Sequence, residues 1–458
     1  MKSRLNPFLQ TAVLAAACAC AGTAHAADLT WNNAASTGAW NSTDANWTGS
    51  TWDNGAPDNA IFNSVGGTVT LDSGITAGSV SVGTTSGNFA NLTLSGGSLS
   101  ASSFTVQGDG NNGGGYGSNP TLTVNSAVNV SGDAAIGRSN LDITGGTLTA
   151  NRIISAPGSA DWGRLVISGG TVTATNGVDG SVNTGATFAI DLNGGTLHTP
   201  SIKVADREAG TNNNAWLTFN GGTVVATADN SSFITTYGGG NNVYISNGGA
   251  TFDTNGHNIE IGTLLRNSAG NNGSLTKNGA GTLTLSYNTG GTIGTYSGAT
   301  TVNEGVLALK ADTAWILLGG SAVTVNSGAT LQGNNSLANQ LNGLTLNNGT
   351  VTASGPGNGD WGNFYLTGNV TATGTSSLTA DIALRAANVD FGVATGGTLN
   401  VGGSIHNGHA FGQNFGTPST VSKSGEGTMV VSGTHTYTGA TTVSAGTLYV
   451  TGALSNSA

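Results

Sequence analysis

The chain has 458 residues, of which only 7% are charged, with 22 Asp and Glu against 12 Lys and Arg and a net charge of −10. A phosphate backbone would repel an acidic chain that lacks a basic stripe, so we exclude nucleic acid as a partner. The low charge also argues against ordinary disorder. A content of 76 glycines with only 7 prolines indicates many short strands joined by tight turns.

The first 26 residues have the pattern of a secretory signal peptide. Lys2 and Arg4 precede an apolar run over residues 11–21, and Ala24-His25-Ala26 has the small residues that a leader peptidase needs. The apolar run is too short to span a bilayer. We therefore expect export of the protein and removal of residues 1–26.

Both cysteines of the chain, Cys18 and Cys20, fall inside this leader. The mature chain then lacks zinc–thiolate sites and thiol nucleophiles, and it keeps 10 basic residues against 22 acidic ones. An exported chain without disulfides is stabilised by packing and hydrogen bonds alone. At this length that requires a large continuous core.

Residues 27–90 are rich in tryptophan. Half of the eight tryptophans of the chain lie here, namely Trp31, Trp40, Trp47 and Trp52. The exposed end of a repeat array needs a large apolar plug, so we predict that residues 27–90 form a cap and the first coils. A sugar-stacking site made of the same rings is the alternative.

Residues 91–273 repeat one phrase: two alternating apolar residues, a small polar residue, Gly-Gly, a hydroxyl residue, and renewed alternation. The copies begin at Leu92, Leu141, Leu165, Ile190, Leu217 and Val243, with a worn copy at Leu122. From Gly145 onward, the first glycines of successive copies are 24, 25, 27 and 27 residues apart. A period of about 25 residues is typical of a solenoid, in which each repeat buries its apolar face on its neighbours.

One period contains roughly three short runs with alternating Val, Ile, Leu or Phe, separated by Gly, Asn, Ser and Asp. A propeller blade needs about 40 residues for its four strands, and a helical repeat needs a 3.6-residue pattern. We therefore predict an all-β right-handed parallel β-helix (β-solenoid) with about 25 residues per coil. Its handedness follows from the usual chirality of parallel crossovers.

Two longer stretches resemble each other. Both contain a Lys-x-Gly-x-Gly-Thr phrase and, further on, Tyr-x-Gly-Ala-Thr-Thr-Val. The motif positions are Gly279, Gly281, Leu283, Tyr296, Gly298 and Gly305 in residues 274–336, and Gly425, Gly427, Tyr437, Gly439 and Gly446 in residues 419–458. Both stretches are similar to the autotransporter-associated β-strand repeat, also called the passenger-associated transport repeat. Residues 274–336 hold the first repeat and a following coil.

The resemblance implies a parallel β-helix in a secreted bacterial passenger, with repeats that aid secretion or folding at the outer membrane. It also implies a partner outside this chain, an outer-membrane translocator or a cell-surface anchor. The chain ends at Ala458 without either, so we expect either a fragment or a protein that another partner secretes. The abrupt ending favours a fragment whose second repeat is truncated. In residues 337–418 the period blurs, and we predict a less regular β-helix there.

The sequence has few side chains that could act as catalytic groups or metal ligands. Asp142 and Asp191 occupy equivalent outward positions two repeats apart, where we expect solvated carboxylates, and we find no Lys or Arg clustered with acids. His406 and His409 form a close pair without a nearby carboxylate. We therefore predict no catalytic, cofactor-binding or metal site, and no enzyme.

Binding in a solenoid is usually carried by protruding loops. The exposed-aromatic candidates are Tyr116, Trp162, Trp361 and Phe364, and for each of them we expect a structural role ahead of a binding one. The leading interpretation is a structural or adhesive surface passenger, secreted and outer-membrane-associated, whose partners are surface glycans or other cells. The alternative is a secreted β-helix that binds or degrades polysaccharide.

Overall fold

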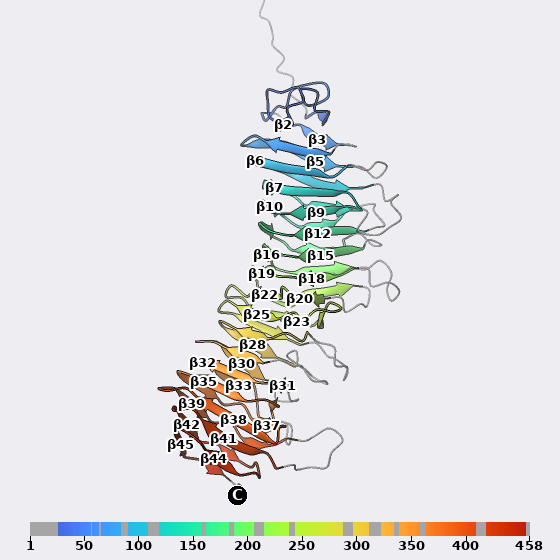
Figure 1. Ribbon diagram of the computed structural model, residues 1–458. Coiled ribbons are helices and arrows are strands. Elements are labelled where there is room, and N and C mark those ends of the chain that lie inside the picture. The colour runs from blue at the N-terminus through green and yellow to red at the C-terminus, as the bar shows by residue number, and fades with distance from the viewer. Residues whose placement is uncertain are drawn as a thin grey trace, which may run out of the picture.

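The computed structural model describes residues 26–454 except 56, 64–65, 84–89, 109–118, 157–161, 183–186, 206–214, 238–242, 287–295, 311–321, 334–338, 358–361 and 409–417. Within these ranges every regular element is a β-strand, and nearly all neighbouring strands pair in parallel. The chain winds as a right-handed parallel β-helix, which confirms the predicted fold class (Figure 1). The predicted signal peptide lies almost wholly outside the described residues and stays a prediction.

Three stacks of parallel strands run along the rod. The first stack contains β1 (Asp28–Thr30), β3 (Asn59–Phe62), β5 (Ile75–Val82), β8 (Ala134–Gly137), β11 (Ile153–Ser155), β14 (Val178–Asp179), β17 (Ile202–Ala205), β20 (Asn230–Tyr237), β23 (Ile259–Ile261), β26 (Thr282–Leu285), β28 (Val306–Leu309), β30 (Thr330–Gly333), β33 (Thr350–Ala353), β36 (Thr375–Leu378), β39 (Thr398–Val401), β42 (Thr428–Val431) and β45 (Thr447–Val450). The second stack contains β10 (Thr147–Ala150), β13 (Thr171–Ala174), β16 (Thr196–Thr199), β19 (Thr223–Ala226), β22 (Ala250–Asp253), β25 (Leu275–Asn278), β27 (Thr300–Val302), β29 (Val323–Val325), β32 (Leu344–Asn347), β35 (Val370–Thr373), β38 (Asn388–Val393), β41 (Thr420–Ser424) and β44 (Thr441–Val443).

The third stack has an upper and a lower part. The upper part contains β2 (Ala39–Trp40), β4 (Gly67–Leu71), β9 (Asn140–Ile143), β12 (Gly163–Ile167), β15 (Phe188–Leu192), β18 (Leu217–Phe219), β21 (Val243–Ile245) and β24 (Leu265–Asn267). The lower part contains β31 (Asn339–Leu341), β34 (Phe364–Leu366), β37 (Ile382–Leu384), β40 (Ile405–Asn407), β43 (Thr434–His435) and β46 (Ala453–Leu454). Two long strands turn the corners between stacks, β6 (Leu92–Gln107) and β7 (Thr121–Val130).

The core consists of inward-facing residues stacked coil upon coil. In one column Leu148, Val172, Leu197, Val224 and Phe252 are paired in register, and each is at most 1% exposed. Complete burial of such a side chain contributes about 1.5–3 kcal/mol. Because each apolar residue touches its counterparts above and below, the alternating pattern of the sequence becomes one continuous core along the rod.

The register stays constant over most of the rod. On the outer surface of the second stack, one column carries threonine in ten consecutive coils: Thr147, Thr171, Thr196, Thr223, Thr251, Thr276, Thr301, Thr324, Thr345 and Thr371. β-Branched residues suit a pleated, half-exposed surface. The worn copy at Leu122 also stacks in register, on Leu141.

An asparagine ladder follows one edge of the second stack, as stacking of equivalent corners suggests. Asn303 donates to Asn278, Asn326 donates to Asn303, and Asn347 donates to Asn326, each through Nδ2 to Oδ1 at 2.7–2.9 Å. Asparagine ladders of this kind add side-chain hydrogen bonds between stacked strands. The ladder therefore links four successive coils.

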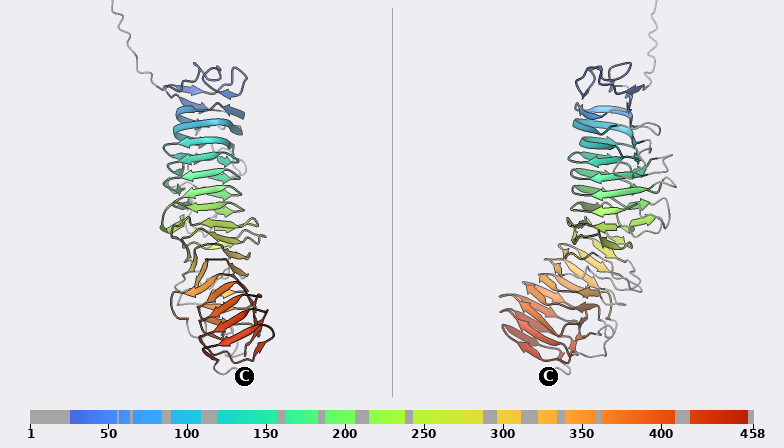
Figure 2. Two further views of the ribbon diagram at one scale, coloured as in Figure 1. Left: turned by 90° about the vertical axis from the view of Figure 1, so that its left-hand side faces the viewer. Right: turned by 45° about the vertical axis from the view of Figure 1, so that its right-hand side comes forward.

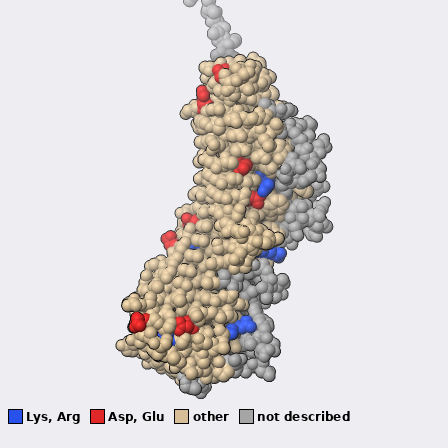
Figure 3. Space-filling view, viewed as in Figure 1, with Lys and Arg blue, Asp and Glu red and all other residues tan. Residues whose placement is uncertain are grey.

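The rod is elongated and bends once. Figure 2 shows a straight upper part, coloured blue to green, and a lower part that tilts away below it. The blurred stretch keeps the coil architecture, since β31, β34, β37 and β40 pair in parallel as one sheet. Figure 3 shows a surface with few charged side chains, as the composition requires.

Candidate functional site

Each of the two long repeats folds so that its second half lies directly on its first half. In the first repeat β25 pairs with β27 and β26 pairs with β28. In the second repeat β41 pairs with β44 and β42 pairs with β45. We call the turn between a strand of the second stack and the following strand of the first stack a corner. One repeat thus consists of two matching corners in successive coils.

The motif glycines lie at these corners. Gly279 and Gly425 have φ angles of 79° and 72°, a region that favours glycine. A Cβ on Gly281 would lie 1.8 Å from the carbonyl oxygen of His257. The other motif glycines approach backbone in the same way, namely Gly298, Gly305, Gly427, Gly439 and Gly446, while Leu283 is fully buried. Close stacking of the corners therefore explains these motif positions.

A buried lysine holds each pair of corners together, and sequence reasoning missed it. Lys277 is completely buried, and its Nζ lies 2.6–3.0 Å from Thr254 Oγ1 and from the carbonyl oxygens of Asn278, Gly279 and Glu304. Glu304 belongs to the next coil. Because these oxygens surround the ammonium, they replace the water that burial removes.

Lys423 repeats the arrangement in the second repeat. Its Nζ lies 2.7–3.1 Å from the carbonyl oxygens of Ser424, Gly425 and Ala445. The sequence did contain a signal for this buried lysine. Lys277 stands two residues after Leu275, at an inward position of an alternating strand, and directly before the Gly-x-Gly turn. Burial lowers the pKa of Lys277 to about 8 and also lowers the pKa of Lys423.

A buried tyrosine forms the second polar contact of each repeat. Tyr296 OH lies 2.7 Å from Thr300 Oγ1, and Tyr437 OH lies 2.6 Å from Thr441 Oγ1. Burial raises the pKa of both tyrosines, because it disfavours the phenolate. Each repeat thus contains its own copy of the same buried polar network, in addition to the shared sequence motif.

The N-terminal tryptophans are buried. Trp31, Trp40, Trp47 and Trp52 are at most 4% exposed, and their rings contact one another with centroids 4.8–5.1 Å apart. Phe62 packs against three of these rings. Burial leaves no ring face for a sugar, so the stacking alternative loses its support at this end. The capping role of residues 27–90 stays our proposal.

The loop aromatics give a different result from the prediction. Phe364 is completely buried on β34, so the expectation that it is exposed was wrong. Its strand is an inward-packed part of the third stack, which the blurred period concealed. Trp162 is half-buried just before β12. Tyr116 and Trp361 lie outside the described residues.

Asp142 and Asp191 share an outward column, but they are not simply solvated. Asp191 is 5% exposed, and its Oδ2 lies 2.5 Å from Nε of Arg164. Trp216 Nε1 donates to Asp191 Oδ1 at 2.9 Å. Asp142 is half-buried and accepts from Ser168 Oγ, and burial raises its pKa.

Acids and bases also meet elsewhere, which corrects the expectation that they do not cluster. Among the described residues, ion pairs with Lys or Arg also join Arg152 to Asp133, Lys203 to Asp179 and Lys310 to Glu260. Each joins successive coils or coils two steps apart, so sequence distance hides it. His406 Nδ1 contacts the carbonyl oxygen of Asn407, and His409 lies outside the described residues. Across the described part of the chain, no three His, Cys, Asp or Glu side chains gather as metal ligands.

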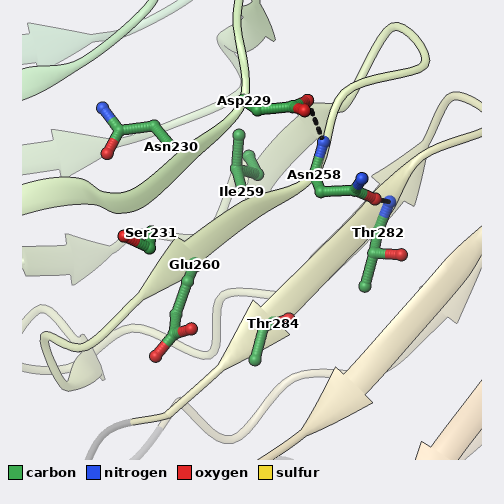
Figure 4. Close-up of a pocket in the computed structure, with 8 residues that line it drawn as sticks. All are labelled: Asp229, Asn230, Ser231, Asn258, Ile259, Glu260, Thr282 and Thr284. Carbon is green, nitrogen blue, oxygen red and sulfur yellow. Dashed lines mark hydrogen bonds between the residues drawn. The ribbon is translucent and has the colours of Figure 1, made fainter.

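A polar groove opens on the first stack, across β20, β23 and β26 (Figure 4). The hollow has a volume of about 410 Å³ and is lined by Asp229, Asn230, Ser231, Asn258, Ile259, Glu260, Thr282 and Thr284. Its cause is a bulge in β20: Asn230 pairs with Ile259 and Ile234 pairs with Ile261, so the extra residues push outward. Bulges of this kind are frequent next to binding sites.

Two polar side chains of this groove accept hydrogen bonds from backbone N–H groups, which fix their positions. Asn258 N donates to Asp229 Oδ1 at 2.8 Å, and Thr282 N donates to Asn258 Oδ1 at 3.1 Å. Backbone hydrogen bonding lowers the pKa of Asp229. The groove therefore presents fixed hydrogen-bonding groups, with Glu260 3.5 Å from Lys310 Nζ.

Comparison with known proteins decides the nature of the two long repeats. The passenger-associated transport repeat family matches residues 275–309 and 421–450. The chain carries two passenger-associated transport repeats. These matched ranges contain the buried lysines and tyrosines described above, so the networks lie within the family's own segments.

One curated relative is the adhesin BmaC autotransporter of Brucella suis biovar 1 (strain 1330). It is 30% identical over 172 residues, which cover 34% of this chain and 4% of that protein. The chain thus spans a small part of the relative's length. The repeats and this relative together make the chain similar to the passenger of a secreted, cell-surface autotransporter.

No solved structure gives a significant match. Within the described residues, no helix has the length and apolar character to cross a membrane.

Proposed function

We propose that this chain is an adhesive, non-catalytic passenger segment of an autotransporter, displayed at the bacterial surface by an outer-membrane translocator of the same precursor. Its single strongest support is the stack of parallel coils that contains both transport repeats. The adhesin name of the Brucella relative supports the adhesive part of the proposal. A long rod suits adhesion because it holds lateral surfaces away from the cell.

The two repeats act, in this proposal, as corner clamps that help the passenger to fold once it has crossed the outer membrane. Lys277 and Lys423 each join the corners of two successive coils through backbone carbonyls. A coil adds to a growing rod only when its corners match those of the preceding coil. The clamp therefore favours correct register at two points along the chain.

Polysaccharide degradation is the competing function. Hydrolysis needs two carboxyl groups that flank one bond. Asp191 is buried against Arg164, and Glu260 lies beside Lys310, so neither is a free acid facing a partner carboxylate. Asp142 is the better candidate for an acid, because burial raises its pKa. These contacts favour binding over catalysis.

The test fuses residues 27–458 to an unrelated autotransporter translocator and displays them on a non-adherent laboratory bacterium. We expect surface display, resistance of the rod to protease, and at least about tenfold more bacteria bound to cultured cells or to purified surface glycans. A matched strain displays an unrelated β-helix of similar length. Display without any gain in adhesion over that strain contradicts the adhesive function, and release of reducing sugar from glycans contradicts the non-catalytic one.

A further inference from the structure

The first strand of the rod begins where the predicted leader ends. β1 starts at Asp28, one residue after Ala27, and it pairs in parallel with β3. Ala26 and Ala27 are both exposed, so the peptide bond between them lies at the surface. The end of a chain is poorly ordered unless hydrogen bonds or packing hold it. The contacts of Ala27 therefore decide how firmly the N-terminal coils, residues 27–90, are closed.

Asp58 and Asn59, at the start of β3, hold Ala27 and Asp28. Ala27 N donates to Asp58 Oδ1 at 2.9 Å, and Asn59 N donates to the carbonyl oxygen of Ala27 at 2.8 Å. Asn59 Nδ2 also donates to Asp28 Oδ1 at 2.8 Å. Two adjacent residues thus fix the first two residues of the predicted mature chain.

Asp58 also contacts the segment that carries a buried tryptophan. Asp53 N donates to Asp58 Oδ2 at 3.4 Å, and Asp53 directly follows Trp52. Trp52 is 2% exposed, and its Nε1 donates to the carbonyl oxygen of Thr76 at 3.2 Å. Asp58 is therefore the point at which the start of the mature chain meets the tryptophan cluster.

No cationic side chain is available to Asp58. The residue is 6% exposed, and burial of a carboxylate without a compensating charge is costly. Residues 26–137 contain no Lys, Arg or His, whereas residues 27–90 alone contain five aspartates. Arg138 follows β8, which lies three strands below β3 in the first stack. Within the described ranges, no ion pair with a side chain reaches Asp58.

Removal of the predicted leader supplies the missing charge. Hydrolysis of the peptide bond between Ala26 and Ala27 consumes one water: the carbonyl carbon of Ala26 keeps its oxygen as a carboxylate, the C–N bond breaks, and both protons go to Ala27 N. The new α-amino group is mostly protonated at neutral pH. We propose that the α-ammonium of Ala27 forms an ion pair with Asp58, and that this pair locks the N-terminal coils closed once the leader has been removed.

The surroundings favour such a pair. Ala27 is exposed, so the N–H groups of the ammonium that do not point at Asp58 stay in water and the desolvation cost is small. Asp58 is already buried, so it gains a counter-charge without further loss of solvent. In the uncleaved chain the same atom, Ala27 N, offers only the dipole of one peptide N–H. The N-terminal coils therefore reach their full stability only in the processed chain.

This inference goes beyond adhesion and rests on the predicted cleavage after Ala26. The first measurement is the mass of the N-terminal peptide after export of the full chain from a Gram-negative host. We expect the peptide to begin at Ala27. A start at Asp28 or later removes the residue that carries the ammonium and overturns the inference.

The second measurement compares two purified proteins that both end at Ala458. One begins at Ala27, and the other carries Gly-Ser-Gly before Ala27, which keeps the N–H of Ala27 but moves the ammonium away. Hydrogen exchange, measured by mass spectrometry on the peptide that contains Asn59, reports on closure because the Asn59 amide donates to Ala27. We expect exchange there to be about tenfold faster in the extended protein and equal in the distant peptide that contains Ile190. Equal exchange in the Asn59 peptide overturns the inference.

Asp58→Asn separates charge from hydrogen bonding, because asparagine keeps an oxygen that accepts from Ala27 N. We expect it to speed exchange at Asn59 about tenfold in the protein that begins at Ala27 and less than about twofold in the extended protein. The matched control is Asp72→Asn, which changes an exposed acid and leaves exchange at Asn59 unchanged in both proteins. Equal effects of Asp58→Asn in the two proteins assign Asp58 a neutral hydrogen bond and overturn the ion pair.

A chemical variant keeps the test decisive if Asp58→Asn fails to fold. N-terminal acetylation of the protein that begins at Ala27 preserves the N–H and every side chain, and it removes only the charge. We expect acetylation to speed exchange at Asn59 about as much as the Gly-Ser-Gly extension does. An acetylated protein that exchanges like the unmodified one overturns the ion pair.

Discussion

Lys277 Nζ lies 2.6 Å from the carbonyl oxygen of Gly279, the residue whose positive φ makes the corner of the first transport repeat. The same ammonium reaches Glu304 O in the next coil at 3.0 Å. One buried cation therefore fixes two stacked corners. Lys423 and Gly425 are related in the same way at 2.7 Å.

Replacement of Lys277 with methionine should destabilise the rod. Methionine fills most of the same volume but leaves the carbonyl oxygens of Gly279 and Glu304 without their donor, and each such loss costs about 1–3 kcal/mol. We expect the free energy of unfolding to fall by about 3 kcal/mol in urea denaturation. The control is Lys203→Met, because Lys203 is 41% exposed and 4.0 Å from Asp179 and should cost less than about 0.5 kcal/mol. Equal effects of the two variants would contradict the clamp.

The lowered pKa of Lys277, about 8, predicts a pH dependence of defined sign. In the unfolded chain lysine keeps its proton up to about pH 10.4, so between pH 8 and that value the unfolded state binds more protons than the folded state. Stability from this group therefore rises with pH in that window, by up to about 2 kcal/mol from pH 7.5 to 9.5. The comparison is wild type against Lys277→Met. A difference between the two that does not change with pH would refute the prediction.

The buried pair Tyr296 and Thr300 should behave as one unit. Tyr296→Phe leaves the Thr300 hydroxyl without its partner, and Thr300 is fully buried, so we expect a loss of about 1–2 kcal/mol. Thr300→Val should cost a similar amount. The double variant should cost little more than either single change, which gives a coupling near 1 kcal/mol in a double-mutant cycle. Simple additivity would show that the contact contributes nothing, and Tyr449→Phe serves as the exposed control.

His435 should make the second repeat sensitive to acid. It is completely buried, Ile405 N donates to its Nδ1 at 3.1 Å, and burial lowers its pKa. Lys423 and Tyr437 line the same small interior space, and neither is an anion that would favour a protonated histidine. Below pH 6.5 the unfolded histidine takes up a proton before the folded one, so stability falls as the pH drops.

We expect the free energy of unfolding to fall between pH 7 and 5.5, by at most about 1.2 kcal/mol, the limit that the unfolded histidine sets, as measured by urea denaturation at each pH. His435→Gln should remove most of this difference. The control is His198→Gln, which changes a half-buried outward histidine on β16 and should leave the loss of stability at low pH unchanged. An unchanged acid response in His435→Gln would rule out His435 as its source.

The fold could be predicted because its cause is local and periodic. Alternating Leu and Ile around Gly145 and Gly169 place apolar residues inward at equal intervals, and coils with equal intervals stack. Phe364 was misjudged because its coil has an irregular length, so the period gave no register there. The asparagine ladder is a similar consequence of stacking, since Asn278 and Asn303 meet only when the register is correct.

The site could be predicted only in part. Asp191, Arg164 and Trp216 lie 25 to 27 residues apart in the chain, and their contacts exist only once three coils are stacked. Lys277 was overlooked because a lysine is normally exposed. Its inward place in β25, repeated by Lys423 in β41, was readable once the strand direction was known.

The asparagine ladder yields a graded prediction. Asn326 donates to Asn303 and accepts from Asn347, so Asn326→Ala removes two side-chain hydrogen bonds, whereas Asn278→Ala at the end of the ladder removes one. At about 0.5–1.5 kcal/mol for each bond, we expect losses near 2 and 1 kcal/mol, respectively, in urea denaturation. The ladder bonds join successive coils, so Asn326→Ala should also increase hydrogen exchange at Val302 and Val325, the strand residues beside it. Equal losses for the two variants would mean that each asparagine acts only within its own turn and that the ladder does not join the coils.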